Sequence, residues 1–366
     1  MTTTRSRRYR LSQPMFDDSR YVTAVACGAC LDVAICGGLR IPGGLFGCQV
    51  TCCGEPDACE RVCRRKSDFK SRVQEIGGLR FENLKIEGQP YTGVMPAVVP
   101  LIYHGASRTV RLDVPFAAVK LAALYDRRTG GPRYATRAAL CDALKITEGT
   151  TIIVSGIDDD PAVERWWEIG RVARRHVIDN LVGIGIGLIT TPNFSVCVDW
   201  PRPGDLAAMM RITRCYEELA DAGMPAALHV NGRTPHDFER WGILLRRTSG
   251  ISHVAYEFST GTAYAGRLEQ HVAWLKELAA GVGRPLGLVM TGDSGAALML
   301  ADAFDTVTWL ESTSFMKTMH RQVAARAGNG EIEWISRPTG PGEDLAGLLT
   351  KNVEESRAMH VMRRAV

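Results

Sequence analysis

The sequence predicts an α/β protein that carries a (β/α)8 TIM-like barrel behind an N-terminal cysteine-rich module. One observation predicts the barrel. From about residue 95 onward, short apolar runs alternate with stretches whose apolar residues recur at helical spacing. Near-continuous apolar strands that alternate with helices are typical of a parallel sheet covered on both faces. The module is predicted by a second observation, the crowding of eight of the eleven cysteines into residues 27–63.

Seven apolar runs are typical of buried parallel strands. They cover residues 98–104, 150–157, 182–190, 225–232, 253–261, 285–292 and 303–310. Helices are expected between them, for example over 204–223 and 262–281, where Gly281 would end the second. Seven or eight such units favour a closed barrel over a doubly wound sheet, because no G-x-G-x-x-G turn follows an early strand.

The chain of 366 residues divides into four predicted parts. A basic arm (1–20) precedes the cysteine-rich module (21–75), and the barrel (90–345) precedes a C-terminal helix (346–366). No charge-free apolar run reaches the roughly 18 residues of a transmembrane helix, so no membrane contact is expected. The first residues lack the apolar segment of a secretory signal, which favours a cytoplasmic location.

The cysteine-rich module is predicted to bind metal through sulfur. Its spacings include one C-x2-C and two C-x3-C pairs, and no histidine occurs before His104. The candidate ligands are Cys27, Cys30, Cys36, Cys48, Cys52, Cys53, Cys59 and Cys63. Tetrahedral zinc and an iron-sulfur cluster both use about four thiolates. Zinc is favoured because the ferredoxin-type C-x2-C-x2-C run is missing. Disulfides are disfavoured in a reducing compartment.

Basic residues flank this module. Arg8 belongs to the N-terminal arm, while Arg64, Arg65 and Lys66 directly follow the last cysteine of the cluster. Such clusters neutralise phosphates. They are the predicted DNA-binding residues, although a solvated surface would have the same composition.

Polar residues follow the predicted strands, at the edge where barrel enzymes place their chemistry. They are Tyr103 and His104; Asp158, Asp159 and Asp160; Thr190, Thr191 and Asn193; His229, Asn231 and Gly232; Glu257 and Ser259; Thr291, Gly292 and Asp293; and Asp305 with Glu311. Amides and carboxylates can hydrogen-bond a purine edge, and a carboxylate can act as nucleophile or base. The set therefore predicts a base-recognising site.

The stretch PLGLVMTGDSGAALMLADAFDTVTW resembles the queuine/archaeosine-type guanine transglycosylases. The resemblance implies that Asp305, in the phenylalanine-aspartate pair, is the nucleophile that displaces guanine from the sugar. ALHVNG resembles the base-binding strand, which implies that Asn231 and Gly232 bind the base. TTIIVSGIDDD resembles the strand that ends in the catalytic base, which implies Asp158, with Asp159 and Asp160 as alternatives. Glu257, Gly292 and Asp293 would line the substrate site.

Two departures separate the chain from the tRNA enzymes of that family. Those enzymes place zinc cysteines after the nucleophile, whereas this chain has no cysteine beyond Cys215. The family's aspartate-serine-glycine-glycine motif is also absent. The sequence is more similar to phage-type DNA transglycosylases, which implies exchange of guanine in DNA for a free 7-deazaguanine such as preQ0 through a covalent aspartate-sugar intermediate.

A phage-encoded enzyme of this kind would work in the host cytoplasm, and the sequence is compatible with a homodimer. Two other functions stay open. One is an iron-sulfur redox or radical enzyme on the same barrel, and the other is a non-enzymatic zinc protein that binds nucleic acid.

Overall fold

The structure, a computed structural model, describes residues 21–23, 40–42, 73–84, 86–88, 90–196, 202–259, 262, 266–327, 331–340 and 342–364. Strands β1 (Tyr21–Thr23) and β2 (Arg40–Pro42) form a short antiparallel ribbon. The eight clustered cysteines and the predicted DNA-binding residues Arg8, Arg64, Arg65 and Lys66 lie outside the described residues.

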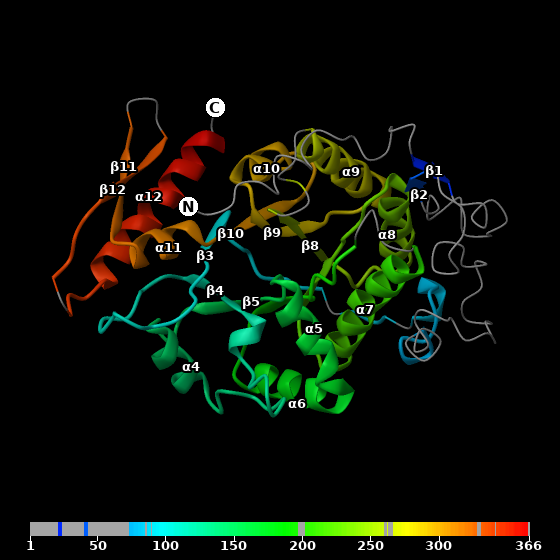
Figure 1. The fold of residues 1–366 in the computed structure, drawn as a ribbon, viewed down its shortest axis with the longest axis horizontal. Coiled ribbons are helices and arrows are strands. Elements are labelled where there is room, and N and C mark those ends of the chain that lie inside the picture. The colour runs from blue at the N-terminus through cyan, green and yellow to red at the C-terminus, as the bar shows by residue number, and fades with distance from the viewer. Residues whose placement is uncertain are drawn as a thin grey trace.

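Eight strands form one sheet in the order β3-β10-β9-β8-β7-β6-β5-β4, and each neighbouring pair in that order is parallel (Figure 1). They are β3 (Val98–Pro100), β4 (Phe116–Lys120), β5 (Thr151–Ser155), β6 (Leu188–Thr190), β7 (Ala226–His229), β8 (His253–Phe258), β9 (Gly287–Gly292) and β10 (Thr306–Glu311). A parallel bridge between Leu101 and Ala118 joins the two end strands. The predicted (β/α)8-like barrel is therefore confirmed.

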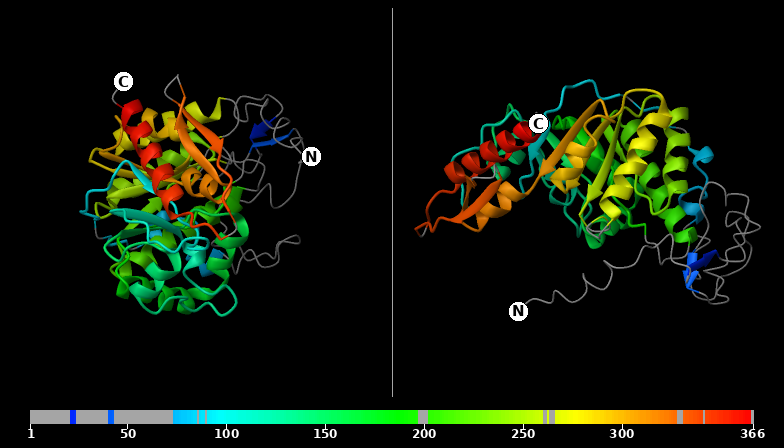
Figure 2. Two further views of the ribbon diagram at one scale, coloured as in Figure 1. Left: turned by 90° about the vertical axis from the view of Figure 1, so that its left-hand side faces the viewer. Right: turned by 90° about the horizontal axis from the view of Figure 1, so that it is seen from above.

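Helices surround this sheet (Figures 1 and 2). They are α4 (Arg137–Leu144), α5 (Asp160–Glu168), α6 (Gly170–Gly183), α7 (Arg202–Asp221), α8 (Pro235–Arg247), α9 (Arg267–Val282), α10 (Ser294–Met299), α11 (Thr313–Met319) and α12 (Ala346–Arg364). Short 3-10 turns occur at η3 (Phe81–Asn83) and η4 (Leu121–Ala123). Within the described residues, no helix is long and apolar enough to span a bilayer.

The barrel has an inner and an outer apolar core. The inner core includes small residues such as Ala118, Ala227 and Ala255, together with Ile153 and Val289. The outer core lies between the strands and the helices and contains larger side chains, among them the fully buried Trp241. Because side chains alternate along a strand, residues that share the face of these inner alanines point into the barrel.

One whole strand and three boundaries differ from the sequence prediction. The apolar runs do not predict strand β4, and α6 runs on to Gly183, so that β6 begins only at Leu188. Helix α9 extends one residue past Gly281, to Val282, and Gly283 follows in the left-handed conformation, with φ of 73°. The third boundary is the start of β10, which lies at Thr306, whereas the apolar run predicts a strand from residue 303.

A hairpin of β11 (Gln322–Arg326) and β12 (Ile332–Ser336) lies beside α11 and α12 at one side of the barrel (Figure 2). The buried Asn352 of α12 fixes it. Its amide Nδ2 donates to Thr318 Oγ1 and to the carbonyl of Gln322, each at 2.9 Å, and its Oδ1 accepts from Ala324 at 2.8 Å. One buried amide thus joins three elements, with its donors and acceptor all used.

Candidate active site

Lys120 is the last residue of β4 and lies two positions after Ala118 of the inner core, so it points into the barrel at the carboxyl ends of the strands. Its ammonium group donates to the carbonyl of Ile157. Burial lowers the pKa of Lys120, and the negative charges of Asp158, Glu257 and Asp159 oppose that shift. Lys120 therefore brings two strand ends, those of β5 and β8, within the electrostatic reach of one cation.

Lys120 is not among the site residues that the sequence predicts. The run FAAVK has only five residues and does not stand out as a strand, although it is apolar up to its final lysine. The signal that could have found it is a lysine at the end of a short, alanine- and valine-rich run. A charged residue there must end a strand or point into a polar site.

The three consecutive aspartates after β5 have different environments. Asp159 is the N-cap of α5 and accepts the N–H of Ala162 at 3.3 Å. Asp160 accepts a hydrogen bond from the hydroxyl of Ser195. Asp158 accepts the N–H of its neighbour Asp159 at 3.0 Å. Of the carboxylates that act on Lys120, Asp158 has the largest electrostatic effect on the lysine pKa. Of the three, Asp158 is the least exposed, and its carboxylate neither caps α5 nor pairs with Ser195.

Asp158 is held in place from the neighbouring strand. Its N–H donates to Asn193 Oδ1 at 2.9 Å, and the N–H of Gly156 donates to Thr190 Oγ1 at 2.8 Å. A side chain at Gly156 would overlap the backbone carbonyl of Thr190. The predicted rim residues Thr190 and Asn193 therefore position the segment that carries Asp158.

Two tyrosines lie within the electrostatic reach of Asp158. Tyr103 follows β3 and Tyr125 follows η4, and the charge of Asp158 contributes to a raised pKa at both phenols, for which burial is the larger cause. The Tyr125 hydroxyl is fully buried and has no hydrogen-bond partner among the described residues. A phenol that stays neutral at physiological pH can donate a proton or a hydrogen bond.

Glu257 lies near the end of β8 on the face of Ala255, and so it points inward. Its Oε1 accepts the N–H of Ser259 at 2.7 Å. Together with Lys120 and Asp158 it forms the group of three that we call the mouth triad. Two carboxylates within electrostatic reach of one lysine can divide the roles of nucleophile and proton carrier.

The other predicted substrate-binding residues lie at the same end of the barrel but have structural contacts. Asn231 Nδ2 donates to the carbonyl of Phe194 at 3.0 Å. A Cβ at Gly232 would lie 2.8 Å from that of Asp237, so glycine there permits close packing of α8. Gly292 has φ of +93° and approaches the backbone of Phe258. Asp293 caps α10 through the N–H groups of Gly295, at 2.7 Å, and Ala296, at 3.2 Å.

The predicted placement of Asp305 at this edge is wrong. Asp305 precedes β10, and its N–H donates to the carbonyl of Leu286, the residue before β9, so it lies at the amino end of the strands. Residues 303–304 continue the turn after α10, where both N–H groups donate to Leu300. The structure therefore does not bring Asp305 to Asp158. Its electrostatic partner is the buried His253 at the start of β8, whose pKa burial lowers to about 4.

His229 ends β7 and is buried, as expected for a core histidine. Its ring stacks on Tyr256 at 6.0 Å, and neither ring nitrogen has a hydrogen-bond partner in the described part of the chain. Burial lowers the pKa of His229 to about 3. The imidazole is thus neutral at physiological pH.

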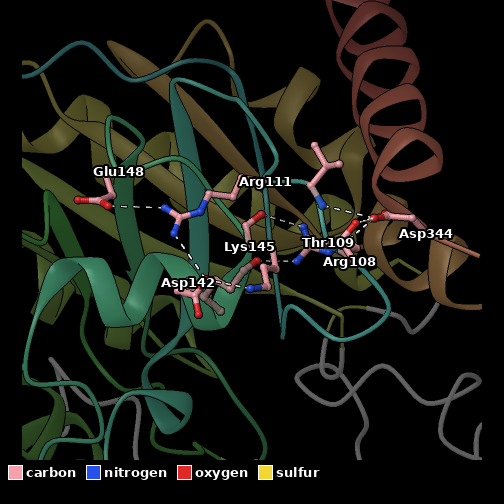
Figure 3. Close-up of polar contacts among 9 residues, drawn as sticks. Arg108, Thr109, Arg111, Asp142, Lys145, Glu148 and Asp344 are labelled. Atoms are coloured by element: carbon pink, nitrogen blue, oxygen red, sulfur yellow. Dashed lines mark hydrogen bonds and ion pairs between the residues drawn. The ribbon is translucent and has the colours of Figure 1, made fainter. Parts of the chain in front are cut away.

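The loop between β3 and β4 carries Tyr103 and His104 and is anchored by Arg108 (Figure 3). The buried guanidinium of Arg108 donates to the carbonyls of His104 at 2.7 Å, Leu144 at 2.6 Å and Lys145 at 3.2 Å. Two of these carbonyls end α4, where a cation also meets the negative end of the helix dipole. Burial lowers the pKa of Arg108 to about 10, so it stays charged.

No group of three or more candidate metal ligands occurs among the described residues, a set that excludes the eight clustered cysteines. Two described cysteines, Cys141 and Cys215, are buried thiols whose pKa is raised by burial, to about 12 for Cys215. Thiols of this kind are unreactive.

No protein-family model matches the chain, and no curated protein matches it significantly.

Proposed function

We propose that the chain exchanges guanine in DNA for a free 7-deazaguanine such as preQ0, and that the mouth triad carries this reaction in place of Asp305. The observation that supports the proposal is the inward placement of Lys120 and Glu257 at the carboxyl ends of β4 and β8, with Asp158 after β5 and both carboxylates within electrostatic reach of Lys120. Glycosyl transfer commonly uses a pair of carboxylates, one to bond the sugar and one to move a proton.

Glu257 is the proposed nucleophile. Its carboxylate attacks C1′ of the target nucleotide while the bond from C1′ to guanine breaks, and the electron pair of that bond leaves with guanine, which takes up a proton. In the return step the incoming base loses its proton, its nitrogen attacks C1′, and the carboxylate is released. Glu257 lies within electrostatic reach of the Lys120 ammonium group, and a carboxylate in such a site can act as a nucleophile.

Asp158 is the proposed proton carrier. Its charge acts on the Lys120 ammonium group and on the neutral phenols of Tyr103 and Tyr125. A carboxylic group there can donate a proton to the leaving guanine and accept the proton that the incoming base loses in the return step. The target nucleotide must leave the helical stack to reach this depth.

The test is transfer of labelled guanine or preQ0 from solution into DNA. Wild-type protein is expected to incorporate label, and Glu257→Gln or Asp158→Asn should reduce the rate by at least about a hundredfold, as expected for loss of a nucleophile or a general acid-base group. Asp305→Asn is the matched control and should retain the wild-type rate. Absence of transfer with guanine, preQ0 and preQ1 would refute the proposed function, and loss in the control alone would restore Asp305.

The cysteine-rich module is proposed to be a structural zinc site. Metal analysis of the purified protein is expected to find zinc, and the protein should be colourless. Charge-transfer absorbance near roughly 400 nm, typical of thiolate-bound iron, would instead favour the iron-sulfur alternative.

Lys120 also supports a second candidate function, carbonyl chemistry through an imine. A buried amine of lowered pKa can attack a substrate carbonyl, releasing water as the carbon-nitrogen double bond forms. Borohydride reduction in the presence of small aldehydes and keto acids, followed by mass spectrometry, would trap a mass adduct on Lys120 if this function holds. An unmodified lysine under these conditions would rule it out.

A further inference from the structure

A tight turn that we call the arginine turn, residues 126–131, follows β4 and Tyr125 at the carboxyl end of the barrel. Asp126 builds it. The Oδ1 atom of Asp126 accepts the N–H groups of Arg128 and Thr129, both at 2.8 Å. Its backbone exchanges hydrogen bonds of 2.8 Å with Gly130 and Gly131. The one carboxylate of the turn is therefore used by its own backbone.

The arginine turn is fixed to the helices that follow β5. Arg165 of α5 donates from Nε to the carbonyl of Arg127 at 2.6 Å. Gly130 has φ of +74°, and a Cβ there would lie 3.2 Å from that of Ala173 on α6. The turn is held from two sides, so its exposed side chains extend from a rigid backbone and lose less entropy when they bind.

The side chains of Arg127 and Arg128 are exposed, and neither forms an ion pair in the described part of the chain. Neighbouring arginines differ in this respect. Arg165 pairs with Glu168 at 3.4 Å, and Arg175 pairs with Asp179 at 2.7 Å. Two adjacent guanidinium groups are thus available to an external anion, and guanidinium groups match phosphate oxygens in a bidentate geometry.

One tyrosine separates these cations from the mouth triad. The charges of Arg127 and Arg165 act on the phenol of Tyr125, and so do the opposite charges of Asp158 and Glu168. The buried hydroxyl of Tyr125, which has no hydrogen-bond partner among the described residues, therefore lies where a basic outer rim meets an acidic interior. A nucleotide combines an anionic phosphate, which suits a basic rim, with a neutral base whose N–H groups can donate to carboxylates in an acidic interior.

We propose that the arginine turn binds the backbone phosphates that flank the nucleotide whose base enters the barrel mouth. This inference rests on the proposed function for the identity of the polymer, because it assigns the phosphates to DNA. It adds a contact surface on the barrel to the basic segments predicted from the sequence. Phosphate contacts of this kind set register and carry no sequence preference.

The experiment measures the binding of a fluorescently labelled DNA duplex and a single strand by anisotropy over a range of salt concentrations. The double variant Arg127→Ala, Arg128→Ala is compared with Arg246→Ala, Arg247→Ala. That control removes another exposed adjacent pair, at the end of α8 and the opposite end of the barrel, of which Arg247 pairs with Glu82 at 3.5 Å. Both variants lose the same net charge.

The turn variant is expected to bind DNA at least about tenfold more weakly. The slope of the logarithm of its binding constant against the logarithm of salt concentration should be shallower by up to about two, close to one for each lost phosphate contact. The control should stay within about twofold of wild type. Equal affinities and slopes for the two variants would overturn the inference. So would displacement of DNA by polyglutamate as readily as by unlabelled DNA, which would favour an acidic protein as partner.

The two proposals fail in different ways. If wild-type protein binds DNA through the arginine turn but transfers no base, the proposed function fails and the phosphate site stands. If base exchange is detected and the turn variant binds and reacts as wild type does, the function stands and the phosphate site fails.

Discussion

The Oδ2 atom of Asp344 accepts the backbone N–H of Thr109 at 2.7 Å, and so the segment before α12 is joined to the loop between β3 and β4 (Figure 3). The same oxygen accepts from Val110 at 3.3 Å, while Oδ1 accepts from Ala346 at the start of α12 at 2.7 Å. One carboxylate thereby connects the loop that carries Tyr103 to the C-terminal helix.

Asp344→Ala should lower the free energy of unfolding by about 1 kcal/mol, the usual effect of losing a helix-capping carboxylate. These hydrogen bonds, the one from the Thr109 hydroxyl first, lower the pKa of Asp344 to about 2. The contribution of Asp344 to the free energy of unfolding is therefore complete above the unfolded pKa of about 4 and is lost as the pH falls toward 2. Urea titrations of both proteins at several pH values should show their difference vanishing at the acid end. A constant difference would contradict this.

Arg108→Lys should destabilise the protein by about 1 to 3 kcal/mol, since a lysine cannot donate to three carbonyls in the planar geometry of a guanidinium. Arg111→Lys is the control. Arg111 is partly exposed and pairs with Asp142 at 3.5 Å and Glu148 at 3.6 Å, contacts that contribute little in water. Chemical denaturation of both variants measures the contrast, and equal losses would argue against a special role for Arg108.

The buried histidines predict loss of stability in acid. Burial lowers the folded pKa of His229 to about 3, of His253 to about 4 and of His271 to about 4. The unfolded chain takes up these protons near pH 6.5, before the folded chain does, so stability is complete above about 6.5 and falls as the pH drops toward 4.

His229→Leu tests this directly, because neither ring nitrogen of His229 has a partner to lose among the described residues. The slope of unfolding free energy against pH should become shallower by up to about 1.4 kcal/mol per pH unit between about 6 and 4, the value for one proton. Thermal unfolding across this range supplies the slope. A variant with the wild-type slope would show that His229 titrates normally.

Gly292→Ala should destabilise the protein by several kcal/mol or prevent folding. The φ of Gly292 is +93°, and a Cβ would lie 2.4 Å from the carbonyl carbon of Phe258. Gly281→Ala in α9 is the control and should be neutral or stabilising by up to about 1 kcal/mol, because alanine favours the helix. Expression and melting temperature of the pair provide the measurement.

The sequence predicted most of the barrel because its strands are long apolar runs with polar residues directly after them. Asp158 is such a case: it follows TTIIVSGI, and the structure places it at the expected edge. Asp305 shows where this reasoning fails. Phe304 is apolar and buried, but it belongs to the turn after α10, and an apolar pattern does not reveal where strand pairing begins.

The mouth triad could be predicted only in part. Asp158 and Glu257 follow long runs, whereas Lys120 ends a run too short to stand out. The division of the three aspartates into a helix cap, a partner of Ser195 and a residue that acts on Lys120 depends on Ser195 and on the start of α5. Contacts of that kind join residues far apart in the chain and leave no mark in local sequence.

The closure of the barrel has a consequence for synthesis on the ribosome. Strand β3 pairs along one edge with β10, and the Thr308 hydroxyl donates to the carbonyl of Pro96 across 212 residues of chain. Along its other edge it has the Leu101–Ala118 bridge. Until β10 has emerged, one edge of β3 stays unpaired and open to other strands. Completion of the ring depends on contacts distant in sequence, which fold slowly, so chaperone demand should be greatest just before β10 emerges.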